Sequence, residues 1–295
     1  MEMRVASIGE ILWDVIGENE FLGGAPFNLC AHLTRLGHNA MFVSAVGTDD
    51  RGARALAKIA ELGIDARFLR QTSEAPTGIS RVLLDAEGRA THEIVRPAAY
   101  DFMSLTDTQL DEMAADQPAW ICYGTLAEIA PGPRALTNLL FQANPDAKRF
   151  YDINLRPNCW TVELASDLLS EADAVKLNEE EAAVLADSFL LPRAFGQFCE
   201  ATARQFHLKI VCITRGPHGC SLFRDGEFIE SPGFSISVAD TVGSGDAFSA
   251  ALLHGFHQGW NLPEIAEFAN RVGALVASRP GATPKWIEKE ALALR

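Results

Sequence analysis

The sequence predicts an α/β fold with a mostly parallel central sheet. Short apolar segments with the strand period alternate along the chain with longer segments that have the helical period, which is typical of parallel βαβ units. Glycine follows two of the predicted helices, at Gly37 and Gly63, where a left-handed residue commonly closes a helix. The length of 295 residues, without repeats or linker-like stretches, predicts one domain with a small flap.

The first hundred residues contain this alternation and one departure from it. Residues 4–9 predict a strand that continues through 10–15, and a helix opens at 23–28. A strand at 41–46 and a helix at 52–62 follow. Residues 77–84 and 89–95 are two strand-like runs joined at 85–88 by a hairpin turn signal, so we expect a flap over one sheet edge or a plain surface hairpin.

The rest of the chain returns to the alternation. The predicted helices are 106–115, 133–143, 162–170, 179–187, 193–206 and 264–278, and the predicted strands are 120–123, 149–153, 174–176 and 210–214. Residues 219–230 predict a second hairpin that turns at Asp225 and Gly226. Apolar and serine residues alternate over 234–238, which predicts a half-buried strand.

Composition excludes several classes of function. The formal net charge of −14 argues against nucleic acid and anionic membranes, because both need clustered Lys and Arg. The six cysteines include no C-x-x-C pair and lie mostly in apolar runs, so we expect reduced core thiols and a cytoplasmic protein. The chain enters a strand pattern at residue 4, without the pattern of a signal peptide, and no apolar run reaches membrane-spanning length.

The most informative stretch is residues 240–248, Asp-Thr-Val-Gly-Ser-Gly-Asp-Ala-Phe. Gly243 and Gly245 permit a tight turn with bare N–H groups, and the helix that starts there adds positive dipole. This combination predicts an anion site that fits a phosphate. Asp246 at its edge is either a helix cap or a base beside the anion site. The helix N-terminus favours ionised Asp246, which predicts a weak base at neutral pH.

Two segments have polar groups suited to a sugar. Asp14 comes shortly before the glycines at 23 and 24 and Asn28, and an Asp with an Asn can accept from and donate to hydroxyls; a turn and a helix cap are the alternative. Asp152, Asn154 and Arg156 alternate at the end of a predicted strand, where ligands of open α/β sheets bind. A solvated loop is the alternative for this second segment.

Two further segments suit a nucleotide. Asn178 and Glu181 predict a reciprocal helix cap, or alternatively Glu181 helps to hold Mg²⁺ through water. Thr214 and Gly216 follow a strand and could face phosphates, with an ordinary loop exit as the alternative. Other signatures are absent, because the sequence contains no Walker A loop, no G-x-G-x-x-G and no G-x-S-x-G. His254 and His257 lack further metal ligands nearby and are expected to be packing or surface residues.

Together these segments resemble the ribokinase-like (PfkB) carbohydrate kinase family over essentially the whole chain. Gly-Gly-Ala-Pro-Phe-Asn at 23–28 resembles the first signature of that family, and Asp-Thr-Val-Gly-Ser-Gly-Asp at 240–246 resembles the second. The start at 9–14 and the segment 152–156 are similar to the fructokinase branch. The resemblance implies a three-layer α/β/α ribokinase-like fold over 1–295, with a small β lid from about 11–25 and 77–100.

The resemblance also implies a role for individual residues. Asp246 would take the proton of the sugar hydroxyl, while the Gly243, Ser244 and Gly245 backbone cradles the phosphoryl group. The sugar contacts would be Asp14, Gly24, Asn28, Asn154 and Arg156. On the nucleotide side, Asn178 and Glu181 would contact Mg²⁺ and phosphate, and Thr214, Gly216 and Asn270 would contact ATP. Asp240 and the Val242 carbonyl would form a K⁺-type monovalent cation site, completed by the loop at 281–282.

Two residues depart from the pattern of the family. Ser244 replaces the more common Ala and should leave the backbone donors intact, whereas Phe27 replaces a small residue and is expected to reshape the sugar pocket. The resemblance implies an ATP-dependent kinase acting on a sugar primary hydroxyl, most simply that of fructose, and a possible homodimer through the lid. Ribose, a nucleoside or a 2-keto-3-deoxy sugar acid are alternative substrates, and a non-catalytic sugar-binding protein of the same fold is a further alternative.

Overall fold

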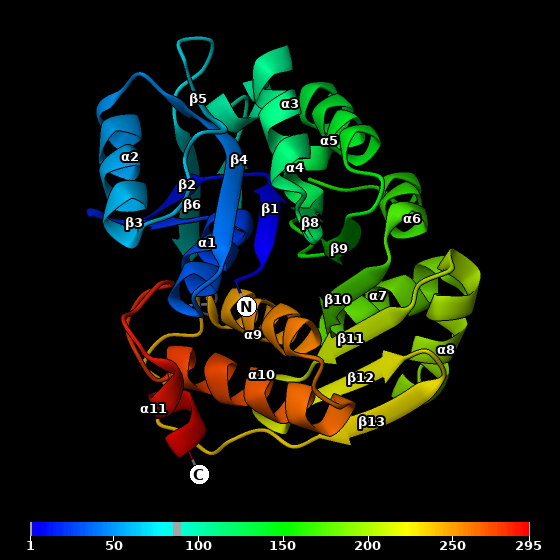
Figure 1. Ribbon diagram of the computed structural model, residues 1–295. Coiled ribbons are helices and arrows are strands. Elements are labelled where there is room, and N and C mark those ends of the chain that lie inside the picture. The colour runs from blue at the N-terminus through cyan, green and yellow to red at the C-terminus, as the bar shows by residue number, and fades with distance from the viewer. Residues whose placement is uncertain (1, 85–89, 295) are drawn as a thin grey trace.

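The chain forms a large sheet covered by helices on both faces, and a separate small sheet (Figure 1). The computed structural model describes residues 2–84 and 90–294. Within them the large sheet has nine strands and the small sheet four. The predicted three-layer α/β fold with a mostly parallel sheet is therefore confirmed.

Strands of the large sheet pair in parallel from β5 to β11, and the β12–β13 hairpin extends the sheet in antiparallel fashion. In spatial order they are β13 (Glu227–Ser231), β12 (Cys220–Arg224), β11 (Ile210–Thr214), β10 (Ala174–Asn178), β9 (Lys148–Asp152), β8 (Trp120–Gly124), β1 (Arg4–Ile8), β4 (Asn39–Gly47) and β5 (Leu69–Thr72). The carboxyl ends of β9, β10 and β11 therefore meet at one edge.

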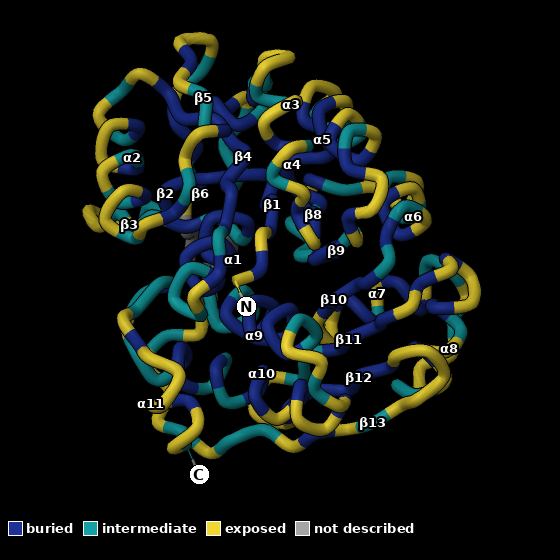
Figure 2. The backbone as a smooth tube through the Cα atoms, viewed as in Figure 1, coloured by how far each residue is buried: buried dark blue, intermediate teal, exposed yellow. Residues whose placement is uncertain are grey.

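Each face of the large sheet has its own apolar core. One core lies under α1 (Ala25–Arg35), α2 (Asp50–Leu62), α9 (Ser244–Gln258), α10 (Leu262–Ala277) and α11 (Glu288–Ala293). The other lies under α3 (Asp107–Asp116), α5 (Pro131–Ala143), α6 (Val162–Glu171), α7 (Glu179–Phe189) and α8 (Phe195–Phe206). The short α4 (Thr125–Glu128) and the 3-10 turns η1 (Ala99–Phe102) and η2 (Gly216–His218) complete the described helices. Figure 2 shows the central strands buried between these layers.

The small sheet consists of β3 (Asn19–Gly23), β2 (Leu12–Ile16), β6 (Gly78–Leu84) and β7 (Ala90–Val95). The prediction that residues 10–15 continue the first strand is wrong, because β2 pairs with β3 and β6 instead. The chain leaves the large sheet at Gly9, where a Cβ would lie 2.6 Å from the Pro26 ring. The predicted pairing of residues 77–84 with 89–95 is confirmed by the antiparallel pair of β6 and β7, and the predicted turn at 85–88 lies outside the described residues.

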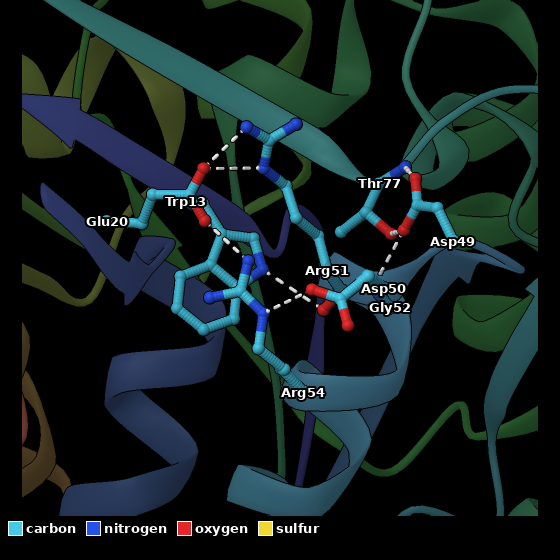
Figure 3. A network of polar contacts seen from close by, with 8 residues as sticks. All are labelled: Trp13, Glu20, Asp49, Asp50, Arg51, Gly52, Arg54 and Thr77. Atoms are coloured by element: carbon cyan, nitrogen blue, oxygen red, sulfur yellow. Dashed lines mark hydrogen bonds and ion pairs between the residues drawn. The ribbon is translucent and has the colours of Figure 1, made fainter. Parts of the chain in front are cut away.

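A polar network joins the small sheet to α2 (Figure 3). Glu20 of β3 accepts hydrogen bonds from Arg51 and Arg54 of α2, each with a shortest distance of 2.5 Å, and the Arg54 guanidinium lies 4.4 Å from the Trp13 ring centroid. Asp49 caps α2 by accepting from Gly52 N at 2.8 Å and also accepts from the Thr77 backbone at 2.8 Å. The start of α2 therefore contacts both halves of the small sheet.

The later elements that the sequence predicted are found with one exception, whereas β3, β5, α4 and α11 were not predicted. The second hairpin is confirmed as β12 and β13, but the predicted strand at 234–238 is wrong. This segment does not pair with another strand, and Phe234, Ser235, Ile236 and Val238 line the cavity beside α10. All six cysteines are free and buried, as expected. Among the described helices, none combines the length and the apolar character that a membrane crossing requires.

Candidate active site

Two cavities meet where α9 begins. The first, which we call the small-sheet cavity, has a volume of about 350 Å³ and is lined by residues of both sheets. The second, the α10 cavity, has a volume of about 560 Å³ and lies among the end of β11, the 233–238 segment and α10. Four residues line both cavities, namely Thr214, Gly216, Thr241 and Gly245. A group could pass from one cavity to the other across this shared wall.

The start of α9 presents bare backbone donors at this wall. Gly243 precedes the helix with φ 76°, and no side chain caps the helix. The first intrahelical hydrogen bond runs from Ala247 N to Gly243 O, so the N–H groups of Gly245 and Asp246 precede the helical bonding pattern. The Ser244 hydroxyl donates to Thr241 O at 2.7 Å. The Ser244 N–H also donates to Thr241 O, at 3.3 Å, so the bare N–H groups at the position of the predicted anion hole are those of Gly245 and Asp246.

Asp246 lies beside this anion hole and lines the small-sheet cavity. Its Oδ2 accepts a hydrogen bond from Asn28 Nδ2 at 2.8 Å. Burial and the nearby Asp152 raise the pKa of Asp246 to about 6, although Lys176, Asn28 and Arg156 act in the opposite direction. The helix N-terminus alone predicts a lowered pKa, so the direction of the shift is opposite to that expected, while a carboxylate with a pKa of about 6 is still a weak base at neutral pH. Asp246 is ionised at neutral pH yet more basic than an ordinary aspartate.

A buried ion pair supports this region, and its lysine was missed from the sequence. Lys176 Nζ donates to both Asp152 oxygens, at 3.1 and 3.2 Å, and both side chains are buried. Ser249 of α9 donates to Asp152 Oδ2 at 3.1 Å and to Gly245 O at 3.0 Å, which links the strand to the helix. A lysine inside the apolar strand at 174–177 is the signal that could have identified it, because buried lysines are rare unless paired.

The structure brings the predicted sugar contacts together. Asp14, Gly24, Asn28, Asn154 and Arg156 all line the small-sheet cavity. Gly24 has φ 115°, and a Cβ there would lie 2.5 Å from Glu10 O, so its backbone packs directly against that of Glu10. Asn28 donates to Asp246, while its buried Oδ1 has no hydrogen-bond partner among the described residues. Its free oxygen is available to a ligand hydroxyl.

Two neighbouring residues modify this prediction. Phe27 does not line the small-sheet cavity, because it is fully buried in the core with its ring centroid 6.2 Å from that of Phe42. Glu10 was missed from the sequence, and it lines the cavity. One of its oxygens accepts from Ala25 N at 3.2 Å, the other has no partner among the described residues, and burial raises the pKa of its carboxyl.

The predicted nucleotide contacts lie around the α10 cavity. Thr214, Gly216 and Asn270 line it. Asn270 Nδ2 donates to Ser231 Oγ and to Pro232 O, both at 3.1 Å, so the amide fixes the start of the segment that forms the opposite wall. Asn270 therefore contributes to the shape of this cavity.

Asn178 and Glu181 form the predicted capping box of α7. Each side chain accepts from the other residue's backbone N–H at 2.8 Å, and Glu181 also accepts from Leu155 N at 2.8 Å. No group of three or more His, Cys, Asp or Glu residues in the described chain could hold a metal by itself. Both Glu181 oxygens thus already accept backbone N–H groups, so the structure confirms the capping box, and the Mg²⁺ contact through water stays a prediction.

The predicted cation loop is assembled by Asp240. Its carboxylate accepts from Val242 N at 3.0 Å and from Gly281 N at 3.1 Å. The 281–282 loop also lies against Gly243, where a Cβ would be 2.3 Å from Ala282 O. The two segments of the predicted monovalent cation site are therefore adjacent, and the ion itself stays a prediction.

The structure combines a parallel α/β sheet with bare helix N–H groups and a carboxylate of raised pKa between two cavities, an arrangement suited to a phosphotransferase. Residues 5–289 match the model of the pfkB family of carbohydrate kinases. The chain is 28% identical to a fructokinase of Escherichia coli over 96% of this chain and 95% of that protein. It superposes on the crystal structure of an ATP-bound fructokinase from Xylella fastidiosa with a TM-score of 0.87 at 24% identity, covering 99% and 98% of the chains.

The 2-dehydro-3-deoxygluconokinase of Thermotoga maritima has a similar fold, with a TM-score of 0.84 at 20% identity and coverage of 99% of both chains. The match to the family model over nearly the whole chain shows that this protein belongs to the pfkB family of carbohydrate kinases, in its fructokinase-like branch. It is an ATP-dependent sugar kinase.

Proposed function

We propose that this kinase phosphorylates a primary hydroxyl of fructose, with Asp246 as the base. The observation that supports this most is the position of the Asp246 carboxylate, which faces the small-sheet cavity beside the bare N–H groups of the anion hole. The similarity to the Escherichia coli fructokinase supports the choice of sugar. In this reaction Asp246 accepts the hydroxyl proton while the sugar oxygen bonds to the γ-phosphorus of ATP and ADP leaves.

The other residues position the two substrates. Asp14, Gly24, Asn28, Asn154 and Arg156 contact the sugar hydroxyls, and the backbone of 243–245 stabilises the charge of the transferred phosphoryl group. On the nucleotide side, Thr214 and Gly216 contact the ATP phosphates, and Asn270 lies beside the adenine. Asn178 and Glu181 orient the Mg²⁺–phosphate group, and Asp240 with the Val242 carbonyl binds K⁺.

The small sheet acts as the lid of the site. The lid, residues of about 11–25 and 77–100 within a single kinase domain, contributes Leu12, Asp14, Ser80 and Ile94 to the wall of the cavity. Closure of a lid over bound sugar excludes water, which suppresses wasteful hydrolysis of ATP. The hydrogen bonds of Glu20 with Arg51 and Arg54 connect this lid to α2.

The substitution Asp246→Asn tests the assignment of the base. The amide keeps the shape of the side chain but cannot accept the proton, so kcat should fall by roughly 10²–10⁴-fold while the far-ultraviolet circular dichroism stays unchanged. The surface substitution Asp187→Asn, in an exposed pair with Arg193, should leave turnover unaltered. Turnover of Asp246→Asn close to that of the wild type would remove Asp246 from the mechanism.

A sugar acid is the second candidate substrate. Arg156 lines the cavity, and within the described residues no hydrogen bond or ion pair holds its guanidinium, so it is available to a carboxylate. Consumption of ATP should be measured with fructose, ribose, a nucleoside and 2-keto-3-deoxygluconate. Turnover restricted to the sugar acid or to the nucleoside would exclude fructose, and sugar binding without turnover of any compound would indicate a non-catalytic sugar-binding protein.

A further inference from the structure

A buried ammonium lies against the anion hole. Lys176 lines the small-sheet cavity with only 7% of its surface exposed. A Cβ at position 245 would lie 3.1 Å from Lys176 Nζ, so the ammonium occupies the space that the glycine leaves empty. The same glycine lies on the wall shared by the two cavities. Lys176 therefore lies where a group passing between the cavities would travel.

The known contacts of Lys176 leave part of its hydrogen-bonding capacity unused. An ammonium has three N–H donors, and the described residues accept two hydrogen bonds from it, both at Asp152. Burial lowers the pKa of Lys176, but the charges of Asp152, Asp246 and Glu181 outweigh burial, so the pKa is raised and the side chain stays protonated. A permanent cation with a spare donor thus lies beside the anion hole.

Neutralising Asp152 is not a sufficient explanation for this lysine. A buried ion pair gains little stability over apolar residues of similar volume, because both charges lose their hydration. The ion pair is instead connected to the first turn of α9, since Ser249 bridges Asp152 and the Gly245 carbonyl. Its position fits a site that must hold negative charge.

We propose that Lys176 is a catalytic residue whose ammonium binds an oxygen of the phosphoryl group during transfer, in addition to its ion pair with Asp152. This inference rests on the proposed function, because it takes the anion hole and Asp246 as the place of transfer. The sugar oxygen–phosphorus bond forms as the phosphorus–ADP oxygen bond breaks, and the hydroxyl proton goes to Asp246. Lys176 gives up no proton, and its fixed charge offsets the charge on the phosphoryl oxygens.

The test compares variants in which Asp152 is never left as an unpaired buried charge. Asp152→Asn is the reference, and Asp152→Asn/Lys176→Met removes the ammonium from it. We expect the double variant to fold with a melting temperature at or above that of the reference and to have a kcat roughly 100-fold lower. Lys209→Met, which removes an exposed lysine paired with Asp173, should leave kcat unchanged.

Equal kcat for the double variant and the reference would overturn the proposal, since it would show that Lys176 only balances Asp152. Asp246→Asn is measured in parallel to separate the two hypotheses. If Asp246→Asn remains active, the proposed base fails; if it is inactive while the double variant equals the reference, only the role of Lys176 fails.

The pH dependence of kcat/KM gives a second readout, which tests whether the charge of Lys176 acts on Asp246. The charged groups that face Asp246 are Asp152, Lys176, Arg156 and Glu10, and Lys176 lowers the pKa of Asp246. Removing the ammonium should therefore move the acid limb of the profile to higher pH in the double variant than in Asp152→Asn. Superimposable acid limbs would contradict a direct interaction of Lys176 with the reacting groups.

Discussion

Asp246 is the residue in which the chemistry of the site and the stability of the fold conflict. Burial raises its pKa from 3.8 to about 6, so the ionised form that accepts a proton is the form that the folded protein disfavours. The stabilising contribution of the protonated carboxyl is present below pH 3.8 and is lost as the pH rises through about 6. At neutral pH the protein therefore holds an unfavourable charge that the proposed reaction needs.

Asp246→Asn should consequently be more stable than the wild type at alkaline pH. The asparagine cannot ionise and its oxygen can still accept from Asn28, so at pH 8 the free energy of unfolding should rise by about 2–3 kcal/mol. Denaturant titrations at pH 8 and pH 4.5 would show the difference shrinking toward the lower pH. A variant that is less stable than the wild type at pH 8 would show that burial of this charge costs little.

The raised pKa of Asp246 could not be predicted from the sequence. The local pattern gave the helix N-terminus, whose dipole favours the charged form. The opposing effects come from Asp152 in β9 and from the walls of the cavity, which are distant in the sequence. The contact between Asn28 and Asp246 likewise joins residues 218 positions apart.

At the scale of elements, the start and the end of α9 provide a matched pair of glycines. Gly243 and Gly259 both have left-handed backbone angles, with φ 76° and 72°. A Cβ at 243 would lie 2.3 Å from Ala282 O, whereas a Cβ at 259 would have no atom within 4 Å. An alanine at either position would therefore pay the same cost for a left-handed backbone, but only an alanine at 243 would also clash with a neighbouring atom.

Gly243→Ala should displace the 281–282 loop or the first turn of α9, and either movement disturbs the anion hole. We expect kcat to fall at least tenfold and the protein to lose more than 2 kcal/mol of stability. Gly259→Ala should cost about 1 kcal/mol, the penalty of the left-handed conformation alone, and keep full activity. Steady-state kinetics and thermal denaturation of both variants test this, and equal effects at the two positions would rule out the clash.

Elements with a strong period and both hairpins were predicted correctly, whereas two segments with the strand period were assigned to the wrong partner or to a strand that does not form. The buried strands and amphipathic helices of the alternation appear at the expected places, because their side-chain pattern is fixed locally. Residues 234–238 have the period of a strand but do not pair with any strand of the described residues. Residues 10–15 were expected to continue the first strand, but after Gly9 the chain enters the small sheet. Lys176 lay inside a correctly predicted strand, yet its partners come from other elements.

At the scale of the whole molecule, the small sheet presents apolar side chains to solvent. Ile16 of β2 is 46% exposed and Phe21 of β3 is 51% exposed, and β3 is an unpaired edge of its sheet in the described residues. Exposed apolar residues at a free edge favour association with another chain. We therefore propose that two copies pair through their lids as a homodimer.

Phe21→Glu should convert such a dimer to a monomer. In a twofold contact the same surface of each copy faces the other, so one substitution places two carboxylates at the interface of a protein whose net charge is already −14. Light scattering coupled to size exclusion should show the mass fall from two chains to one. Leu190→Glu, at a side chain 92% exposed at the end of α7, should leave the mass of the dimer unchanged. A wild-type protein with the mass of one chain would exclude the dimer. A Phe21→Glu variant with the mass of two chains would place the interface elsewhere, because β3 has no other apolar residue as exposed as Phe21.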